Sequence, residues 1–307
     1  MSKRKIEHFD IAAAKKAYAD GGNITELLRK QKNSSLNTPE IIEIAYDLQA
    51  GTYIESIKKN PKQSALYTSE LAQILSHHIK PNSSLLDIGT GELTTLSLVF
   101  SELKQKPSEV LAFDISWSRI YKGIGFAQQK MGADFQILTT FVGDISEIPL
   151  LDKSINITTS SHALEPNGGK LKELIEELFR VTTDKLVLFE PCYEINSKEG
   201  KERMDKLGYI KNINGIVEDL GGDVVGKIKI ENTSNPLNPT VCFVIKPPAI
   251  NTDSPSKKEF SVPGTNISLQ KEDNFYYSSQ IGLCYPILKN IPILKSSCAI
   301  LATSLLD

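Results

Sequence analysis

Residues 84–190 alternate between short apolar segments and longer amphipathic ones, and this alternation limits the possible folds more than any other feature. The apolar segments predict strands at 84–89, 109–114, 135–142, 155–160 and 185–190. Between them, apolar residues recur at helical spacing in 93–103, 117–131 and 169–181. Strands that alternate with helices form a parallel sheet with helices on both faces, so we predict a doubly wound α/β fold.

The segment after residue 190 follows a different pattern. Helices are expected at 198–207 and 213–220, followed by strands at 223–231 and 240–246 with no helix between them. Two strands joined by a loop of this kind pair antiparallel. The predicted sheet therefore has seven strands and ends in an antiparallel pair.

Two further units flank this central domain, which we place at residues 64–249. Residues 1–63 predict short helices, one of them with Thr38 as its N-cap and Pro39 at its first position. This extension is either a lid over a ligand or a cover for one face of the sheet. The stretch 247–258 is rich in Pro, Ser and Lys and predicts a linker, so residues 250–307 form the linker and a small β-rich module that starts near Phe260.

The composition favours a globular protein of the cytoplasm. The 307 residues are 40% hydrophobic and 23% charged, which is ordinary for a folded chain. The sequence contains no apolar run of membrane-spanning length and does not begin with a secretory signal pattern. Its four cysteines follow neither a disulfide framework nor a zinc-ligand spacing, so we expect a reducing compartment and no metal.

Charge is distributed unevenly along the chain. Residues 64–249 contain 19 Lys and Arg against 24 Asp and Glu, a net charge of −5, whereas residues 1–63 carry +3 and residues 250–307 are neutral. Proteins that bind nucleic acids draw most of their affinity from Lys and Arg that neutralise phosphates. An acidic central domain therefore speaks against a polynucleotide partner.

A glycine turn follows the first predicted strand in the sequence Asp87-Ile-Gly89-Thr-Gly91-Glu-Leu93. Two glycines allow a tight turn whose backbone amides approach a ligand at the next helix. Dinucleotide-binding turns need a third glycine and carry their acid one strand later, whereas here Leu93 holds the third position and Asp87 lies inside the turn. This arrangement suits a ligand that has an ammonium group and no pyrophosphate.

The second and third predicted strands also end in acids. Asp114 stands where a carboxylate accepts hydrogen bonds from both hydroxyls of a ribose. Asp144 could accept from an adenine amino group, with Ile115 and Ile145 on either side of the ring. The carboxyl ends of parallel strands face a common crevice, so the three acids predict one binding site.

These motifs resemble those of the class I S-adenosylmethionine-dependent methyltransferases over about residues 64–247. The resemblance includes the seven-stranded order and implies S-adenosyl-L-methionine as cofactor. Gly89 and Gly91 would shape the methionine-binding turn, Asp114 would hold the ribose, and Asp144 with Ile145 would hold the adenine. The sequence departs from the pattern at Leu93 and in the 27 residues that separate Asp87 from Asp114. A nicotinamide-dependent oxidoreductase is the alternative.

Catalytic candidates follow the fourth and fifth predicted strands. They are His162, Glu165 and Glu190, as a general base or groups that orient the acceptor, and Tyr193 could line the acceptor pocket. The fourth strand lacks the Asn-Pro-Pro-Tyr type of motif found in relatives that methylate planar nitrogens. A small-molecule acceptor is therefore favoured, such as the hydroxyl or amine of a sugar or sugar nucleotide. Whether oxygen, nitrogen or carbon is methylated stays open.

The C-terminal module carries a second resemblance. Residues 276–294 look like the end of the small zinc-ribbon-like subunit that activates methyltransferases of tRNA and translation factors. Ser278 and Ile281 stand where that family has zinc-binding cysteines, so a bound metal is not expected. The module would then stabilise or dimerise the enzyme, or simply extend its sheet. Two alternatives remain: methylation of a translation component, and a non-catalytic role as activator of another methyltransferase.

Overall fold

The computed structural model describes residues 11–34, 37–249 and 259–305, so most of the predicted linker lies outside the described residues. The α-helices are α1 (Ile11–Ala19), α2 (Ile24–Lys32), α3 (Pro39–Leu48), α4 (Thr52–Lys59), α5 (Pro61–Ser76), α6 (Thr94–Glu102), α7 (Trp117–Met131), α8 (Leu171–Val181), α9 (Lys198–Leu207) and α10 (Ile213–Asp219). The strands of the main sheet are β1 (Ser84–Ile88), β2 (Glu109–Asp114), β3 (Leu138–Val142), β4 (Ile155–Ser161), β5 (Thr182–Pro191), β6 (Asp223–Lys229) and β7 (Thr240–Lys246).

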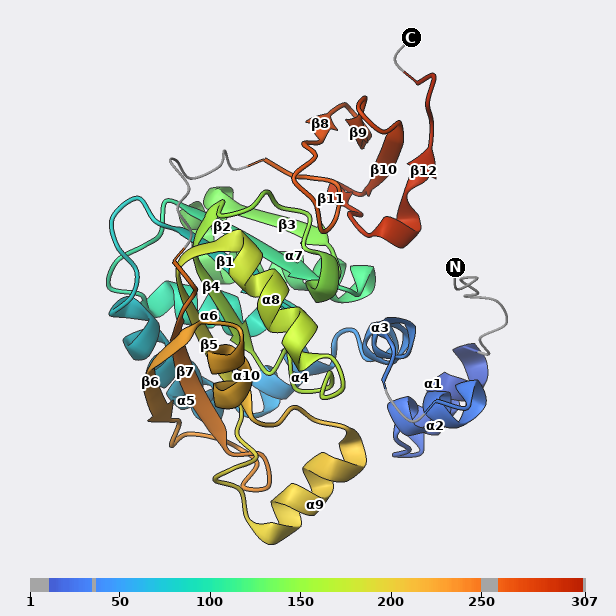
Figure 1. The fold of residues 1–307 in the computed structure, drawn as a ribbon. Helices are drawn as coiled ribbons and strands as arrows, with labels where there is room; N and C mark the ends of the chain where they lie inside the picture. Colours follow the sequence, from blue (N-terminus) through green and yellow to red (C-terminus); the bar gives the residue numbers. More distant parts are fainter. Residues whose placement is uncertain (1–10, 35–36, 250–258, 306–307) are drawn as a thin grey trace.

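These seven strands form one sheet in the order β3-β2-β1-β4-β5-β7-β6 (Figure 1). Strands β1 to β5 pair in parallel, and β7 runs antiparallel to both of its neighbours, β5 and β6. The predicted doubly wound fold with a closing antiparallel pair is confirmed. Because β1 lies between β2 and β4, the carboxyl ends of these three strands share one edge of the sheet.

Apolar residues fill both faces of this sheet. Along β1, Leu85 packs into one core cluster and Leu86 into the other, as the two-residue period of a strand requires. Helices α5, α6 and α7 cover the face of Leu85, and α8 and α10 cover the face of Leu86. Strands buried on both faces account for the nearly continuous apolar runs in the sequence.

The structure differs from the predicted boundaries mainly around β3. Residues 135–137 belong to a 3₁₀ helix (Gly132–Ile137), and β3 starts at Leu138, which pairs with Val110. Phe135 and Ile137 still pack against the core, which explains their strand-like apolar character. In α5, Pro61 occupies the first helical turn, where its missing amide costs no hydrogen bond.

The N-terminal helices form a layer with a small core of its own, built from Ile24, Leu28, Ile41 and Ala45. Helix α3 begins as predicted: the Thr38 hydroxyl accepts from the amide of Ile41, and Pro39 follows the cap. In Figure 1 this layer stands beside the sheet, with α3 and α4 nearest to it.

The C-terminal module contains a second sheet in the order β11-β10-β9-β8, with β12 paired to β10. Its strands are β8 (Gln270–Lys271), β9 (Phe275–Ser278), β10 (Leu283–Leu288), β11 (Ile291–Pro292) and β12 (Ile300–Leu301). The module lies against β3, the edge strand of the main sheet (Figure 1), where the amide of Leu294 donates to the carbonyl of Val142 at 2.8 Å. Its buried Tyr285 and Leu294 belong to the same core cluster as β1 and β4. The module therefore packs as an extension of the domain.

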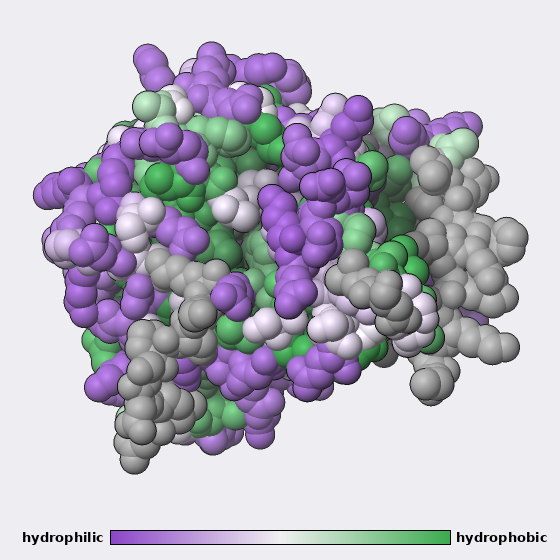
Figure 2. Space-filling model, turned by 90° about the horizontal axis from the view of Figure 1, so that it is seen from above, coloured by the Kyte–Doolittle hydropathy of each residue, from purple (hydrophilic) through white to green (hydrophobic). Residues whose placement is uncertain are grey.

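Hydrophilic residues cover much of the face shown in Figure 2, and hydrophobic ones appear in patches between them. Among the described residues, none of the helices has the length and apolarity to cross a membrane.

Candidate functional site

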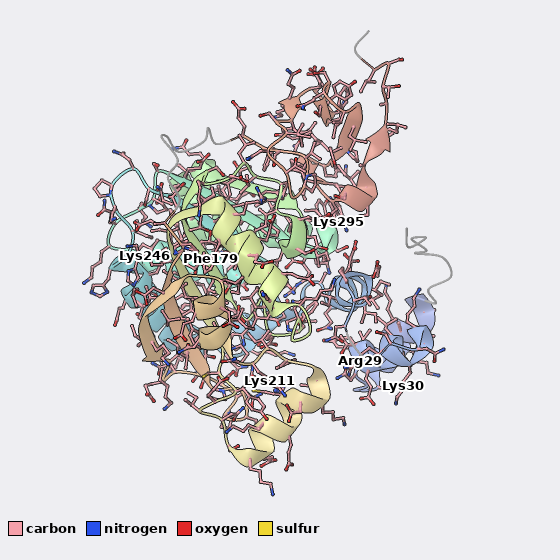
Figure 3. All side chains as sticks on the ribbon, in the orientation of Figure 1. Arg29, Lys30, Phe179, Lys211, Lys246 and Lys295 are labelled. Carbon is pink, nitrogen blue, oxygen red and sulfur yellow. The ribbon has the colours of Figure 1, made fainter. Side chains whose placement is uncertain are left out.

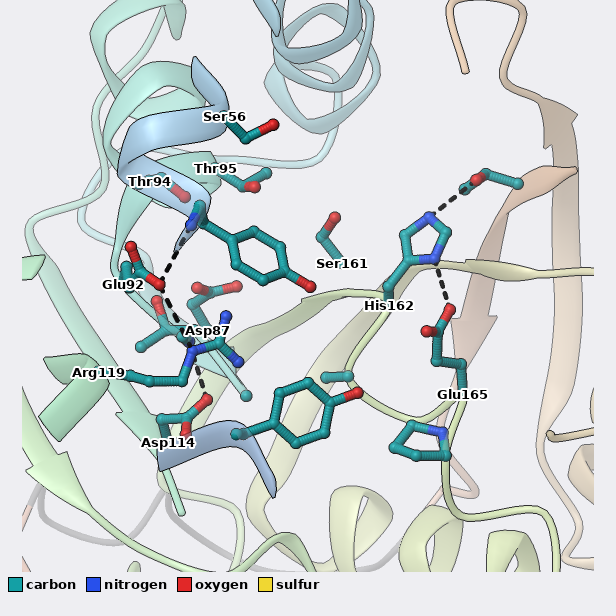
Figure 4. Close-up of a pocket in the computed structure, with 18 of the residues that line it drawn as sticks. Ser56, Asp87, Glu92, Thr94, Thr95, Asp114, Arg119, Ser161, His162 and Glu165 are labelled. Carbon is teal, nitrogen blue, oxygen red and sulfur yellow. Dashed lines mark hydrogen bonds and ion pairs between the residues drawn. The ribbon is translucent and has the colours of Figure 1, made fainter. Parts of the chain in front are cut away.

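A cavity of about 800 Å³ lies at the shared carboxyl edge of β1, β2 and β4. Nine of the residues singled out in the sequence line it: Asp87, Gly89, Gly91, Asp114, Ile115, Asp144, Ile145, His162 and Glu165. Figure 4 shows Asp87 and Asp114 on one side of the cavity and His162 with Glu165 on the other. Glu190 and Tyr193 are not among the described residues that line the cavity.

The two glycines of the turn have left-handed backbone angles, with φ of 58° at Gly89 and 57° at Gly91. A Cβ on Gly89 would lie 2.5 Å from the Cβ of Ala163, so this glycine allows the loop after β4 to press against the turn. That contact fixes Ala163 against the turn, and His162 precedes it in the same loop. Leu93 adopts φ of 57° without being glycine, and it does so as a fully buried residue before α6.

Two of the strand-end acids are held by backbone amides. Asp114 accepts from the amides of Gly91 at 2.9 Å and Ser116 at 2.8 Å, so it connects the ends of β1 and β2. Asp144 accepts from the amide of Ser146 at 2.9 Å. Both carboxylates are thereby fixed at the cavity wall before any ligand binds.

Asp87 is buried without a basic partner among its hydrogen bonds. Burial raises the pKa of Asp87 to about 7, the charge of Asp114 adds to this rise, and the nearby Thr90 hydroxyl opposes it. A cation brought into the cavity would favour the ionised carboxylate. Asp87 is therefore suited to receive an ammonium group.

On the opposite side of the cavity, His162 is held through both ring nitrogens. Its Nδ1 lies 2.7 Å from Glu165 Oε2, and its Nε2 lies 2.9 Å from the Thr240 hydroxyl. Asn238 also donates to Glu165 Oε2, at 3.1 Å. Burial opposes a charge on His162, but the hydrogen bond and the charge of Glu165 outweigh it and raise the pKa of His162. His162 and Asn238 in turn lower the pKa of Glu165, although burial alone would raise it.

Glu190 holds the loop that contains His162. Its Oε1 accepts from Ser160 Oγ at 2.7 Å and from the amides of Ala163 and Leu164 at 3.0 and 3.1 Å. These bonds hold the loop in which His162 adopts a left-handed φ of 58°. Burial raises the pKa of Glu190 to about 7, and the charge of His162 opposes the rise. Glu190 is thus placed to position the loop without touching a ligand.

Tyr193 lies away from this cluster. Its hydroxyl donates to Asp205 at 3.3 Å, and the ammonium groups of Lys201 and Lys211 lie over its ring. The structure offers no contact between Tyr193 and the cavity.

Arg119, Tyr46, Tyr53 and Glu92 also line the cavity, and no sequence motif assigned them a role. Arg119 is 6% exposed, and its guanidinium lies 5.1 Å from the ring centre of Tyr46 and 4.5 Å from that of Tyr53. Figure 4 shows Arg119 between Glu92 and Asp114. One feature of the sequence pointed to Arg119. A basic residue in the first turn of α7 interacts unfavourably with the helix dipole, so a function outside the helix would explain its presence there.

The layer of N-terminal helices meets the cavity through two carboxylates at helix N-termini. Glu92 accepts from the amides of Tyr53 and Ile54 at the start of α4, at 3.3 and 2.9 Å. Conversely, Asp47 of α3 accepts from the Ser116 hydroxyl at 2.7 Å and the Ser118 amide at 3.2 Å, at the start of α7. Both contacts are made by residues next to the predicted cofactor-binding positions.

Uncharged polar side chains make up part of the cavity wall, beside apolar and aromatic ones such as Ile42, Ile57 and Tyr67. The polar side chains come from the α4–α5 region and from the segment between β6 and the first residue of β7, and the two meet where Gln63 donates to the carbonyl of Asn232 at 3.0 Å. They are Ser56, Asn60, Gln63, Ser64, Asn232, Thr233, Ser234, Asn235, Asn238 and Thr240.

In the C-terminal module, the two positions that the resemblance aligns with zinc-binding cysteines differ in their exposure to solvent. Ser278 is buried, whereas Ile281 is exposed. Among the described residues there is no group of three His, Cys, Asp or Glu side chains that could hold a metal ion.

No protein-family model and no curated protein matches this chain. Three solved structures illustrate its likeness of fold. A chain from the complex between the Haloferax volcanii Trm112 methyltransferase activator and a candidate methyltransferase is 14% identical, with a TM-score of 0.49 over 64% of this chain and 94% of that one. Magnesium protoporphyrin IX methyltransferase from Synechocystis PCC 6803 is 14% identical, with a TM-score of 0.49 over 66% of this chain and 98% of that one.

Geranyl diphosphate C-methyltransferase from Streptomyces coelicolor A3(2) is 12% identical, with a TM-score of 0.46 over 58% of this chain and 79% of that one. At these identities the likeness concerns the fold alone, and the case for a function rests on the residues of the cavity.

Proposed function

We propose that this chain is an S-adenosylmethionine-dependent methyltransferase that acts on a small, polar acceptor. The observation that carries the proposal is the juxtaposition in one cavity of a glycine turn, three strand-end acids and, across from them, the His162–Glu165 pair. The alternative oxidoreductase is disfavoured because Asp87 lies inside the turn, where a pyrophosphate would meet its carboxylate.

The residues present fit this cofactor. Asp114 would accept from the ribose hydroxyls, and Asp144 would accept from the adenine amino group between Ile115 and Ile145. Asp87 would receive the ammonium group, which agrees with its raised pKa in the absence of a cation. When bound, S-adenosylmethionine supplies a methyl group on a positively charged sulfur.

His162 is the proposed general base for an acceptor with a proton to lose. Glu165 binds Nδ1 and so leaves Nε2 as the basic nitrogen, which contacts the Thr240 hydroxyl. An acceptor hydroxyl or ammonium would take the place of Thr240 at Nε2. Glu165 then stabilises the imidazolium that results, and Glu190 keeps the loop in position.

The uncharged polar side chains of the cavity wall, two of which (Asn238 and Thr240) lie at His162, support an uncharged, hydroxyl-bearing acceptor such as a sugar. Amide and hydroxyl groups can both donate to and accept from a polyol. A sugar nucleotide is a poorer fit, because its diphosphate would need cations that this wall does not provide among its described residues. We therefore favour a neutral sugar or an amino sugar over a sugar nucleotide.

Thermal unfolding with added ligand tests the cofactor assignment. S-adenosylhomocysteine should raise the melting temperature of the protein in a concentration-dependent way, and NADH should leave it unchanged. Stabilisation by NADH and not by S-adenosylhomocysteine would favour the oxidoreductase.

A transfer assay with labelled S-adenosylmethionine tests the acceptor class. Neutral sugars and amino sugars should accept the methyl group, and sugar phosphates and sugar nucleotides should not. Transfer confined to the phosphorylated compounds contradicts the proposed acceptor class and leaves the cofactor assignment intact.

A further inference from the structure

Arg119 occupies a place in the cavity that neither the fold nor the acid cluster explains. It lies in the first turn of α7, and Gly123, one turn later, brings that helix very close to the glycine turn. A Cβ on Gly123 would lie 2.4 Å from the carbonyl oxygen of Glu92. This close approach carries the Arg119 side chain over the turn.

The glycine turn leaves room for the guanidinium. A Cβ on Gly91 would lie 2.7 Å from an Arg119 Nη atom, so any larger residue at position 91 would displace the arginine. Arg119 is therefore packed directly against the segment at which the proposed cofactor's amino-acid portion is expected.

The surroundings hold Arg119 without using all of its donors. Tyr46 and Tyr53 stack on the guanidinium, and Glu92 lies 4.0 Å from Nε, beyond hydrogen-bond distance. Nε is buried and has no hydrogen-bond partner in the described part of the chain. A buried guanidinium with an unpaired N–H donor would gain a charge-assisted hydrogen bond if an anion bound beside it.

The charges of the cavity narrow the choice of anion. Among its described lining residues, Arg119 is the lone Lys or Arg. The proposed cofactor carries a single carboxylate, on its amino-acid portion, which is also the portion with the ammonium group assigned to Asp87. An arginine over the turn and an acid within it match the two charges of an amino acid.

We infer that Arg119 binds the carboxylate of the cofactor's amino-acid portion, with Tyr46 and Tyr53 holding the guanidinium in place. This inference rests on the proposed cofactor. It makes the N-terminal helices part of the cofactor site, because α3 and α4 supply the two tyrosines.

A ligand pair that differs only in the carboxylate tests this role by calorimetry. The ligands are S-adenosylhomocysteine and its decarboxylated analogue, which keeps the adenosine, the sulfur and the ammonium group. The wild-type protein should bind S-adenosylhomocysteine about 10-fold to 100-fold more tightly, the range for a charge-assisted hydrogen bond. In Arg119→Gln that preference should fall to within about 2-fold, mainly through weaker binding of S-adenosylhomocysteine.

Two further variants control for structural effects. Lys122→Gln removes a donor of the same helix that bonds the carbonyl of Ala50, so it loosens the N-terminal layer without removing the cavity cation. It should keep the wild-type preference. Arg119→Lys retains the charge and should keep part of it, and it serves in place of Arg119→Gln if that variant does not fold.

The result that overturns the inference is an Arg119→Gln protein that loses affinity for both ligands by the same factor, which is the behaviour of a merely structural residue. Equal affinity of the wild-type protein for the two ligands also overturns it. Failure of the proposed cofactor is a separate outcome, because the wild-type protein would then bind neither ligand.

Discussion

At the scale of single residues, the site is defined by groups whose protonation depends on one another. Asp87 and Glu190 are buried carboxyls with pKa values raised to about 7, whereas Glu165 is held ionised by His162 and Asn238. Three acids of similar chemistry thus have different tasks: receiving an ammonium group, positioning a loop and stabilising an imidazolium. Their surroundings, more than their identity, set these tasks.

Replacing Glu165 should lower the pKa of His162. In the wild-type protein burial lowers the pKa of His162, but the Glu165 carboxylate outweighs it and holds the pKa above 6.5; in Glu165→Gln only the weaker effect of the Glu190 charge still opposes burial. NMR titration of the imidazole signals checks this, since the chain has only four histidines to assign. An unchanged titration curve for His162 would show that Glu165 does not tune it.

Replacing Asp87 should alter the pH dependence of stability. The folded state keeps a proton on Asp87 up to a pH of about 7, whereas the unfolded chain loses it near 3.8, so stability falls as the pH rises through this window. Asp87→Asn removes that loss, so the change in the free energy of unfolding from pH 4 to pH 8 should be about 4 kcal/mol more favourable in the variant than in the wild-type protein.

Urea unfolding of both proteins at pH 4 and pH 8 measures this difference. S-adenosylhomocysteine should no longer stabilise Asp87→Asn against thermal unfolding, because the ammonium group of the ligand loses the Asp87 carboxylate as its partner. An identical pH dependence in the two proteins would contradict the assignment of a raised pKa to Asp87.

At the scale of elements, carboxylates at the N-termini of helices connect the N-terminal layer to the domain. Asp47 of α3 caps α7, and Glu92 caps α4, so each side supplies a carboxylate to the other. Lys295 of the C-terminal module adds an ion pair with Glu43 of α3, and Figure 3 shows Lys295 between the module and that helix. Polar contacts of this kind can open at lower cost than an apolar core.

Removing the Asp47 cap should loosen this layer selectively. In Asp47→Ala, amide hydrogen exchange in α3 and α4 should become faster, because the bonds to Ser116 and Ser118 are lost. Exchange in β1 and β4 should stay unchanged, since both strands are buried in the centre of the sheet. Uniform acceleration across the chain would show that the layer does not open on its own.

The elements also show what sequence reasoning can and cannot reach. The strands and the acids at their ends were predictable, because apolar runs followed by Asp87, Asp114 and Asp144 are local patterns. The role of Arg119 was not: its place in the first turn of α7 marks it as unusual, but what it does depends on Tyr46 and Tyr53, which lie more than sixty positions earlier in the chain. Apolar content alone also could not separate the 3₁₀ turn before β3 from the strand itself.

At the scale of the whole molecule, the C-terminal module and the sheet share one core. The module was predicted as a unit beyond a linker, with an extension of the enzyme's own sheet as the alternative, and no local pattern could identify the strand on which it docks. Leu294 and Tyr285, both fully buried, join the core cluster that includes Leu86 and Ile88. A β-strand edge that would otherwise be exposed is covered by this contact.

Truncating Leu294 should therefore destabilise the entire domain. Leu294→Ala removes a fully buried side chain and should lower the free energy of unfolding by about 2–4 kcal/mol in a single cooperative transition. Urea unfolding followed by both tryptophan fluorescence and circular dichroism measures it. Two separate transitions, with only one shifted, would show that the module folds independently of the sheet.

The central claim is that one cavity holds the cofactor on the acids and presents its sulfur to His162. A crystal structure with S-adenosylhomocysteine tests this most directly. We expect the ribose hydroxyls on Asp114, the adenine amino group on Asp144, and the sulfur facing the His162 side of the cavity. A ligand bound elsewhere, or one whose sulfur faces away from His162, would contradict the account.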